Sequence, residues 1–453
     1  MTGYDLIVVG GGAAGLGAAR EAVRRGAKVL LVSDGEPGGD CTFTGCVPSK
    51  TLIESAARGE SFAVATQRVR DAVARIAATE DAAALRTEGI DVVLGRARLT
   101  GPVRVGVDGR GYAARRLIVA TGSAPAVPSI LGLADRAYLT NETVFDLASP
   151  PASLAVLGGG AVGCELAQAY ARLGVAVTVV EAEDRLLGRE EPEASRVIAD
   201  VFAREGIAVH TGAGVTEAAP HGLTLADGTT VRAERLLVAT GRTPVTADLD
   251  LDAAGIRVDE RGHVVTDDRL ATTAPGAYAA GDVTGRLPFT HAAYAMGRIA
   301  AGNALGGRQR YRAYGTPWVT FTDPEVARVG VTEAEAAARG GRVAYLPMAE
   351  MDRAITAGAT DGYVKLIAGP RPVLRHLGGG RVLGATIVAA RAGEMIHEPA
   401  LAMATGMFTG RLAAATHAYP TWSYGIQLAA AQFCMTIGGR KATPARDPLS
   451  GGR

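Results

Sequence analysis

Residues 4–33, YDLIVVGGGAAGLGAAREAVRRGAKVLLVS, align without a gap to residues 152–181, ASLAVLGGGAVGCELAQAYARLGVAVTVVE. In each stretch a short run of β-branched residues leads into a glycine-rich turn, an amphipathic helix and a second strand. Such a strand–helix–strand unit favours two parallel strands. A second repeat supports this, because LIVATGSAP at 117–125 resembles LLVATGRTP at 236–244. The sequence therefore predicts an α/β fold with two domains built on one plan.

Both turns have the spacing Gly-x-Gly-x-x-Gly between their strand and their helix. The first glycine allows a tight turn, the second lets the backbone approach a pyrophosphate, and the third packs the helix against the strand. The amides at the helix N-terminus then face the anion with a favourable dipole. Two dinucleotide sites are predicted, with glycines at Gly10, Gly12 and Gly15 and at Gly158, Gly160 and Gly163.

The residue that ends the second strand differs between the two repeats. In the second repeat it is Glu181, whose carboxylate can accept from a ribose 2′-hydroxyl and would repel a 2′-phosphate. NADH is therefore favoured over NADPH, although Arg185 lies nearby in the sequence and could serve a phosphate. In the first repeat the position is Ser33, followed by Asp34. A hydroxyl there can still bond a ribose, but the acidic signature is missing.

The length of 453 residues is too great for one ordinary core and predicts two to four domains. We expect a first domain over 1–150 and a second over 151–270. Residues 271–315 return to a strand-and-turn pattern that completes the first domain. Residues 316–453 have alternating strands followed by helices, which predicts a third, α+β domain.

The composition narrows the function classes. Hydrophobic residues make up 48% of the chain and charged residues 21%, which is typical of a soluble globular protein. A net charge of +1 gives no support to a nucleic-acid or membrane-surface partner. Apolar runs stay short of the roughly 20 residues that span a bilayer. The N-terminus enters a strand almost at once and leaves no room for a signal peptide, so we expect a cytoplasmic protein.

The four cysteines divide into two kinds. Cys41 and Cys46 are separated by four residues and followed by VPSK, which predicts a loop that runs into a helix N-terminus. A helix N-terminus and a nearby cation, here Lys50, stabilise a thiolate. Cys164 and Cys434 sit in apolar helical sequence, and we expect packed, unreactive thiols. Four cysteines form neither a disulfide framework nor the paired spacing of a zinc site.

The segment GGDCTFTGCVPSKTL resembles the redox-active segment of the FAD-dependent pyridine nucleotide–disulfide oxidoreductases. This family includes dihydrolipoamide dehydrogenase, glutathione reductase and the core of mercuric reductase. The likeness extends to ATG at 120–122 and 239–241, YAAGD at 278–282 and FTDPEVARVGVTEAEA at 321–336. It implies two Rossmann-like domains and a C-terminal dimerisation domain. The chain would form a homodimer whose active site is shared across the interface.

The resemblance implies FAD in the first domain and a nicotinamide in the second. Asp282 would hold the ribityl chain of the flavin, and Ala97 would meet the adenine through its backbone. The implied cofactor contacts also include Thr121, Gly122, Gly241 and Gly281.

The implied reaction passes electrons from NAD(P)H through FAD to a Cys41–Cys46 disulfide and on to a small oxidised substrate. Cys46 would lie against the flavin, and Cys41 would attack the substrate. Lys50 would sit near the flavin N5 and pair with Glu165, because a charged lysine stabilises negative charge on reduced flavin.

The C-terminal acid–base motif is altered. The family motif His-x-His-Pro-Thr-x-x-Glu corresponds here to HAYPTWSY at 417–424, so that Tyr419 replaces the proton-shuttling histidine and Tyr424 the orienting glutamate. His417 matches only the first, less critical histidine. A phenol with a pKa of about 10 is a poor base at neutral pH, and loss of a general acid–base costs roughly 10²–10⁴ in rate.

Three functions stay open after this change. The first is a reductase for an unusual disulfide or other thiol-reactive substrate. The second is a quinone or electron-acceptor reductase that uses flavin directly, and the third is a binding flavoprotein with low turnover. Mercuric reductase is disfavoured because residues 441–453 hold no vicinal cysteine pair and no N-terminal Cys-x-x-Cys module is found. Dihydrolipoamide dehydrogenase is disfavoured by the two tyrosines.

One residue of the redox segment also departs from its relatives. Asp40 stands where threonine is common, directly before Cys41. Its charge would raise the pKa of the neighbouring thiol, or it is a solvent-facing turn residue; both interpretations stay open.

Overall fold

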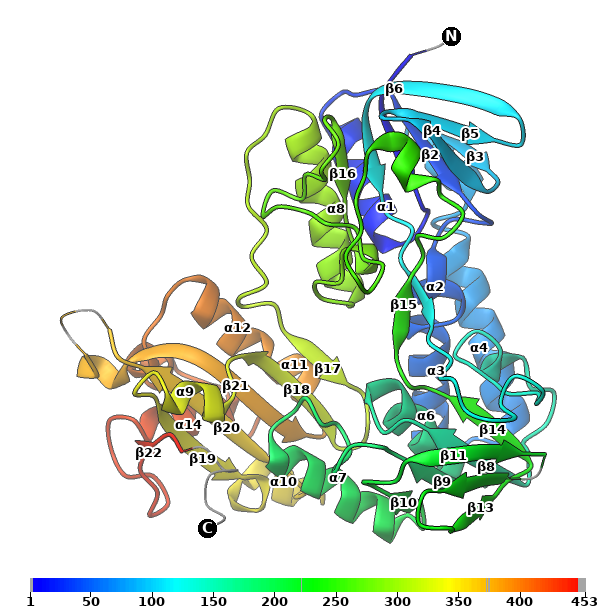
Figure 1. Ribbon diagram of the computed structural model, residues 1–453. Helices are drawn as coiled ribbons and strands as arrows, with labels where there is room; N and C mark the ends of the chain where they lie inside the picture. Colours follow the sequence, from blue (N-terminus) through cyan, green and yellow to red (C-terminus); the bar gives the residue numbers. More distant parts are fainter. Residues whose placement is uncertain (1–2, 221, 372, 374, 447–453) are drawn as a thin grey trace. The chain divides into compact units, whose positions relative to one another are not determined.

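The computed structural model describes residues 3–220, 222–371, 373 and 375–446 (Figure 1). Its contacts divide the chain into two compact units. The first is built from three chain segments, residues 1–129, 137–150 and 237–313. The second takes the remaining segments, the largest being residues 151–236 and 314–453.

A mixed sheet of seven strands forms the centre of the first unit. Its order is β3-β2-β1-β6-β5-β4, with β16 also paired to β6. The pairs among β1, β2, β3, β6 and β16 are parallel, and those of β4 and β5 are antiparallel. The strands are β1 (Tyr4–Val9), β2 (Val29–Ser33), β3 (Ile90–Leu94), β4 (Ala97–Gly101), β5 (Arg104–Val107), β6 (Arg110–Val119) and β16 (Ala277–Ala279).

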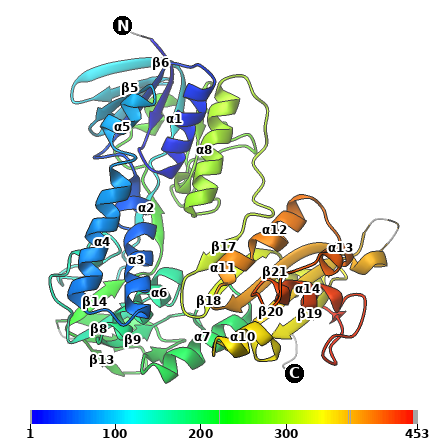
Figure 2. The same ribbon diagram turned by 180° about the vertical axis from the view of Figure 1, so that it is seen from behind.

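Two helices run alongside each other on this sheet, α1 (Ala13–Arg24) and α8 (Thr290–Ala304) (Figures 1 and 2). Small residues allow their close approach. A Cβ at Gly297 would stand 2.0 Å from the carbonyl oxygen of Ala14, so only glycine fits there. The apolar face of each helix joins Leu6, Val8 and Leu31 in one core.

The segment after β2 carries four helices, of which α3 and α4 lie side by side (Figure 2). Two short strands from distant parts of the chain, β7 (Ser123–Pro125) and β15 (Arg242–Pro244), pair antiparallel. The helices are α2 (Gly39–Phe43), α3 (Cys46–Ala57), α4 (Phe62–Ala77) and α5 (Ala82–Thr87), with 3-10 turns η1 (Val144–Asp146), η2 (Leu251–Ala254) and η3 (Asp282–Thr284) elsewhere in the unit.

The second unit begins with the other strand–helix–strand repeat. Its sheet has the order β10-β9-β8-β14, and both β8–β9 and β9–β10 are parallel. An antiparallel sheet β11-β12-β13 follows. The elements are β8 (Ser153–Leu157), α6 (Ala161–Arg172), β9 (Ala176–Val180), α7 (Pro192–Arg204), β10 (Ala208–His210), β11 (Val215–Ala219), β12 (Gly222–Leu225), β13 (Thr230–Arg232) and β14 (Arg235–Val238).

The C-terminal part of the second unit is an antiparallel sheet with helices. Its order is β17-β18-β21-β20-β19-β22, and side chains such as Val364, Leu366 and Ile387 form its core with the helices. The strands are β17 (Trp318–Thr320), β18 (Glu325–Gly330), β19 (Arg342–Pro347), β20 (Tyr363–Gly369), β21 (Arg381–Ala389) and β22 (Thr443–Pro444). The helices are α9 (Glu333–Ala337), η4 (Met348–Glu350), α10 (Asp352–Thr356), η5 (Leu377–Gly379), α11 (Ala392–Met395), α12 (His397–Ala404), α13 (Thr409–Ala414) and α14 (Tyr424–Ala431).

Two parallel strand–helix–strand units and a separate antiparallel sheet with helices confirm the predicted fold class. The limits of the four predicted segments stay a prediction. Residues 237–270, assigned by sequence to the second domain, contribute Leu249, Leu251 and Val264 to a core with β1 and β2. Within the described residues, none of the helices has the length and apolar character needed to cross a membrane.

Candidate active site

The two glycine-rich turns have almost the same geometry. Gly10 and Gly158 both have φ of +112°, a conformation that side chains rarely adopt. A Cβ at Gly15 would meet the carbonyl oxygen of Gly10 at 1.8 Å, and one at Gly163 would meet that of Gly158 at 1.9 Å. The third glycine of each repeat is therefore required by packing, as predicted.

The N-termini of α1 and α6 fit the phosphates of dinucleotides such as FAD and NADH. Gly12 and Gly160 are the N-cap residues, and among the described residues no side chain caps either helix. A Cβ at Gly160 would meet nothing within 4 Å, and one at Gly12 would meet only Gly39, at 3.9 Å. Both helix N-termini thus lack a side-chain cap and have room beside the cap glycine, as a bound pyrophosphate requires.

The ends of the second strands differ as the sequence suggested. Ser33 is buried at the end of β2, and its hydroxyl packs against Gly11. Asp34 is exposed and pairs with Arg96 at 3.3 Å. After β9, Glu181 accepts hydrogen bonds from the amides of Gly159 at 2.6 Å and Glu183 at 2.8 Å. Its carboxylate therefore borders the second glycine turn.

Arg185 turns back onto its own loop. Its Nη2 donates to the carbonyl oxygens of Gly188 at 2.5 Å and Glu190 at 3.2 Å. The guanidinium is therefore engaged by backbone carbonyls, which weakens the interpretation that it serves a 2′-phosphate.

Asp282, the predicted ribityl contact, lies at the start of η3 after β16. Its Oδ2 accepts from the Ser123 hydroxyl at 2.7 Å, and Arg242 Nε lies 3.9 Å away. Ser123 is the first residue of β7, and Thr121 and Gly122 directly precede it. The remaining predicted contacts also lie in the first unit: Ala97 begins β4, Gly241 precedes β15, and Gly281 precedes η3.

The two cysteines come from adjacent helices. Cys41 lies in α2, and Cys46 is the first residue of α3, which confirms the predicted helix N-terminus. Cys46 is exposed, and its sulfur lies 3.3 Å from the Thr290 hydroxyl at the start of α8. Because Cys41 donates a hydrogen bond to the sulfur of Cys46 and is itself partly buried, the pKa of the Cys41 thiol is raised.

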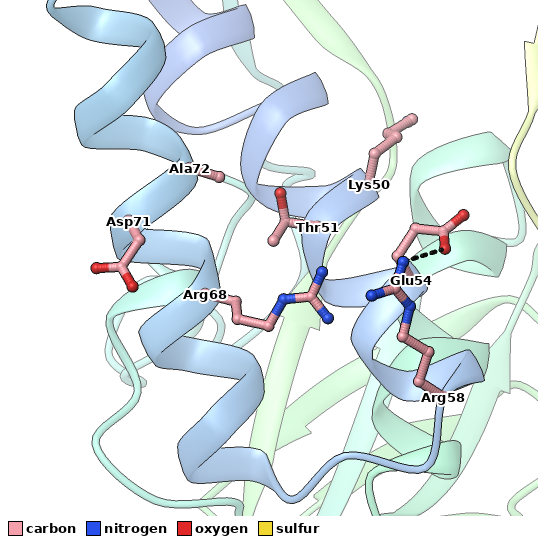
Figure 3. Close-up of a pocket in the computed structure, with 7 residues that line it drawn as sticks. All are labelled: Lys50, Thr51, Glu54, Arg58, Arg68, Asp71 and Ala72. Carbon is pink, nitrogen blue, oxygen red and sulfur yellow. Dashed lines mark ion pairs between the residues drawn. The ribbon is translucent and has the colours of Figure 1, made fainter.

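Lys50 lies one helical turn after Cys46 and lines an open hollow of about 430 Å³ between α3 and α4 (Figure 3). Arg68 extends from α4 toward α3 and is paired with Glu60 at 2.6 Å. Glu165, in α6, is buried and accepts from the amide of Phe321 at 2.8 Å. Since Lys50 and Glu165 belong to different compact units, their pairing stays a prediction.

Asp40 has partners that the sequence did not suggest. Its carboxylate accepts from the Thr44 hydroxyl, forms an ion pair with Arg242, and lies 3.4 Å from the Asn141 amide nitrogen. The interpretation as a solvent-facing turn residue is therefore wrong. No local signal could have found Arg242, which is 202 residues away.

The C-terminal stretch contains two separate polar pairs. The Tyr419 hydroxyl donates to Asp352 Oδ2 at 2.6 Å, and its ring meets Tyr424 edge-on, with the centroids 5.8 Å apart. The hydrogen bond to Asp352 raises the pKa of Tyr419. His417 Nε2 lies 2.9 Å from Glu398 Oε1, and its Nδ1 lies 2.9 Å from the carbonyl oxygen of Ala415. Sequence reasoning missed Asp352 and Glu398 because neither belongs to a local motif.

The other two cysteines differ from each other. Cys164 is buried in α6, and burial raises the pKa of its thiol, as expected for a packed residue. Cys434 is exposed, so its expected packing is wrong. It lies beyond the end of α14 at residue 431, although the apolar sequence continues through it. Among the residues that the structure describes, no group of histidines, cysteines and carboxylates could hold a metal ion.

Comparisons with known proteins agree with this geometry. Residues 4–297 match the family model described as pyridine nucleotide-disulphide oxidoreductase, and residues 316–430 match the dimerisation domain of that family. The chain is 39% identical to mercuric reductase of Streptomyces lividans, over 96% of this chain and 97% of that protein. It is 34% identical to dihydrolipoyl dehydrogenase of Thermus scotoductus, over 95% and 97%.

Solved structures give the same picture. The Cu(II) complex of the HOCl-induced flavoprotein disulfide reductase RclA from Escherichia coli superposes with a TM-score of 0.88 at 29% identity, covering 95% of this chain and 99% of that one. LpdA from Mycobacterium tuberculosis superposes with a TM-score of 0.86 at 31% identity, covering 95% and 100%.

Proposed function

Because this chain belongs to the pyridine nucleotide-disulphide oxidoreductase family, we propose that its FAD-dependent reaction runs through Cys41 and Cys46 to a thiol-reactive substrate. The enzyme is a flavoprotein disulfide oxidoreductase that uses a pyridine nucleotide, and it forms a homodimer. The observation that carries the proposal is the pair of neighbouring thiols, one of them at a helix N-terminus.

The cofactor residues follow from the two turns. The N-terminus of α1 with Gly12 would hold the pyrophosphate of FAD, and Asp282 would hold its ribityl chain. FAD supplies the change from two-electron hydride transfer to thiol chemistry. The N-terminus of α6 with Gly160 would hold the pyrophosphate of the nicotinamide cofactor.

The two thiols divide the work. Cys41 attacks one sulfur of the substrate, the substrate S–S bond breaks, and a mixed disulfide forms. The Cys46 thiolate then attacks Cys41, the second substrate thiol leaves, and the protein keeps a Cys41–Cys46 disulfide. The substrate has gained two electrons and two protons, and the protein has lost them. The helix N-terminus favours the thiolate at Cys46, which supports its place beside the flavin.

The altered acid–base residues limit which disulfides the enzyme can reduce. A leaving thiolate from an ordinary disulfide needs a proton, and Tyr419 is a phenol whose pKa is raised further by Asp352. An activated disulfide, whose leaving thiol has a low pKa, needs no such proton. We therefore place the substrate among activated or unusual disulfides.

A second candidate is a thiophilic metal ion. It is favoured by the relatives described as mercuric reductase and by the same missing imidazole. A divalent ion such as Hg²⁺ takes both electrons that one NADH supplies and leaves as the element. No leaving thiolate then has to be protonated.

NADH is the proposed nicotinamide donor. Glu181 borders the second turn, and Arg185 is engaged by the carbonyl oxygens of its own loop. Replacement of Glu181 by alanine should raise kcat/KM for NADPH relative to NADH about tenfold, because the carboxylate no longer repels a 2′-phosphate. Steady-state kinetics with both donors measures this ratio. An Arg185→Ala control should leave the ratio within about twofold; a larger loss of NADPH use in that variant would contradict the assignment.

We also place the protein in the cytoplasm, where a cysteine pair that cycles between thiols and disulfide is kept reducible.

Anaerobic titration of the purified holoenzyme with NADH and dithionite tests the central proposal. We expect uptake of four electrons per subunit and the long-wavelength absorption of a thiolate beside a flavin. An endpoint of two electrons would contradict it and favour direct reduction of a quinone by flavin. Turnover with activated disulfides, lipoamide, Hg²⁺ and Cu²⁺ then separates the substrate classes. If none of these acceptors supports NADH oxidation, a binding flavoprotein with low turnover would be favoured.

A further inference from the structure

Asp40 lies in α2 directly before Cys41, and its carboxylate reaches into the loop between the two cysteines. It accepts from the hydroxyl of Thr44, which stands between Cys41 and Cys46. The Asn141 amide lies 3.4 Å from the same carboxylate and donates to the carbonyl oxygen of Thr44 at 3.3 Å. Asp40 and Asn141 thus hold both the side chain and the backbone of Thr44.

The backbone of the loop is equally restricted. The Thr44 amide donates to the carbonyl oxygen of Asp40 at 2.9 Å. A Cβ at Gly45 would stand 2.8 Å from that same oxygen, so the turn closes tightly against Asp40. Few conformations remain for the four residues that separate the thiols.

The other end of this arrangement is Arg242 in β15. It forms the ion pair with Asp40, in which the two side chains are 27% and 34% exposed. Its Nε donates to the Ser123 hydroxyl and its Nη2 to the Ser123 carbonyl oxygen, each at 2.7 Å. The cysteine loop is therefore tied to the paired strands β7 and β15, far away in the sequence.

We propose that Asp40 is a positioning residue that sets the thiol–disulfide equilibrium of Cys41 and Cys46 by holding their loop, through Thr44 and Arg242, in the geometry that the bond needs. This proposal rests on the disulfide function proposed above. Oxidation forms one S–S bond and releases two protons and two electrons to the oxidant. A held loop keeps the effective concentration of one thiol at the other high, which favours the disulfide.

Loss of Asp40 moves the equilibrium in one direction by two routes. A looser loop lowers the effective concentration and favours the dithiol. Removal of a negative charge next to Cys41 favours its thiolate, which again favours the reduced form. The variant pair should therefore be more oxidising than the wild type.

The test measures the pair itself and not turnover. Holoenzyme is equilibrated without oxygen in glutathione redox buffers, quenched with acid and alkylated, and the peptide containing residues 39–50 is analysed by mass spectrometry. Asp40→Ala should change the equilibrium constant about tenfold toward the dithiol, which is about 30 mV for a two-electron couple. Thr44→Val, which alters no charge, should change it about threefold, and Asp40→Asn should lie between these values. The control Asp268→Ala breaks an exposed ion pair with Arg310 in the same unit and should change nothing.

The outcomes separate the two levels of the proposal. A wild-type protein that never forms the Cys41–Cys46 disulfide would overturn the proposed function. A normal wild-type equilibrium that Asp40→Ala and Thr44→Val leave within about twofold would overturn the role of Asp40 alone. A lower melting temperature with an unchanged equilibrium constant would also overturn it, because that result marks a purely structural contact. If Asp40→Ala does not fold, Asp40→Asn and Thr44→Val decide the question.

Discussion

The cysteine turn at residues 39–50 and the C-terminal stretch at residues 417–424 both align with segments that serve one reaction in related enzymes. The first keeps its thiols, its helix N-terminus and Lys50. The second has phenols where an imidazole and a carboxylate are expected. In the proposed function, this chain therefore retains electron transfer through sulfur, whereas its supply of protons is changed.

The structure shows what the changed stretch does with its polar groups. Tyr419 donates to Asp352 from α10, and His417 is bound by Glu398 from α12. The carboxylate partner of position 419 thus comes from residue 352 and not from position 424. A phenol in this arrangement holds its proton at neutral pH, because its hydrogen bond to Asp352 raises its pKa. It can orient a substrate by its ring or its hydroxyl but is a poor base.

The largest effect should come from the retained region. Cys46→Ser removes the sulfur that closes the disulfide, so turnover of disulfides should fall at least about 10³-fold. Reduction of the bound flavin by NADH should persist, because that step needs no thiol. Stopped-flow absorbance measures the reduction of the flavin, and a steady-state assay measures the turnover of disulfides. A variant with most of its acceptor activity would show that electrons leave without the cysteines.

The changed region should respond in the opposite direction. Tyr419→His restores a group that titrates near a pH of about 6.5 and lies beside Asp352. Turnover of an ordinary disulfide such as lipoamide should rise about tenfold or more, toward the contribution typical of a general acid–base. The matched variants Tyr419→Phe and Tyr424→Phe should change it by only about threefold. A Tyr419→His variant without any gain would show that position 419 does not serve the reacting thiol.

A smaller effect concerns the pH dependence of the thiols. The pKa of Cys41 is raised because Cys41 donates to Cys46 and is partly buried. In the reduced protein Cys41 therefore has a smaller thiolate fraction at neutral pH than an ordinary thiol, and that fraction is the species that attacks the substrate. Cys46→Ser removes the first of these causes, so alkylation of Cys41 at a pH of about 8 should become roughly threefold to tenfold faster. Mass spectrometry of timed iodoacetamide reactions measures the alkylation rate of Cys41 in the wild type and in Cys46→Ser. Equal rates would contradict the effect of Cys46 on the pKa of Cys41.

Local patterns in the sequence predicted a large part of this molecule. The glycine spacing predicts both turns because each glycine contacts atoms only a few residues away, such as Gly15 against Gly10. The Cys41–Cys46 pair was also predictable, because the two cysteines are only five positions apart in the sequence. Contacts such as Asp40–Arg242 and Tyr419–Asp352 join residues 202 and 67 positions apart, and no period or motif links them. The exposure of Cys434 was mispredicted because an apolar sequence continues past the end of its helix.

The contact between Cys46 and Thr290 has a consequence for biosynthesis. The two residues are 244 positions apart, and α8 contributes to the same core as α1. A ribosome that adds roughly 5–20 residues per second needs about 12–50 s to pass from one to the other. During that interval the nascent thiol emerges without the helix that later adjoins it. The newborn chain therefore lacks the finished surroundings of Cys46 until translation has passed residue 304.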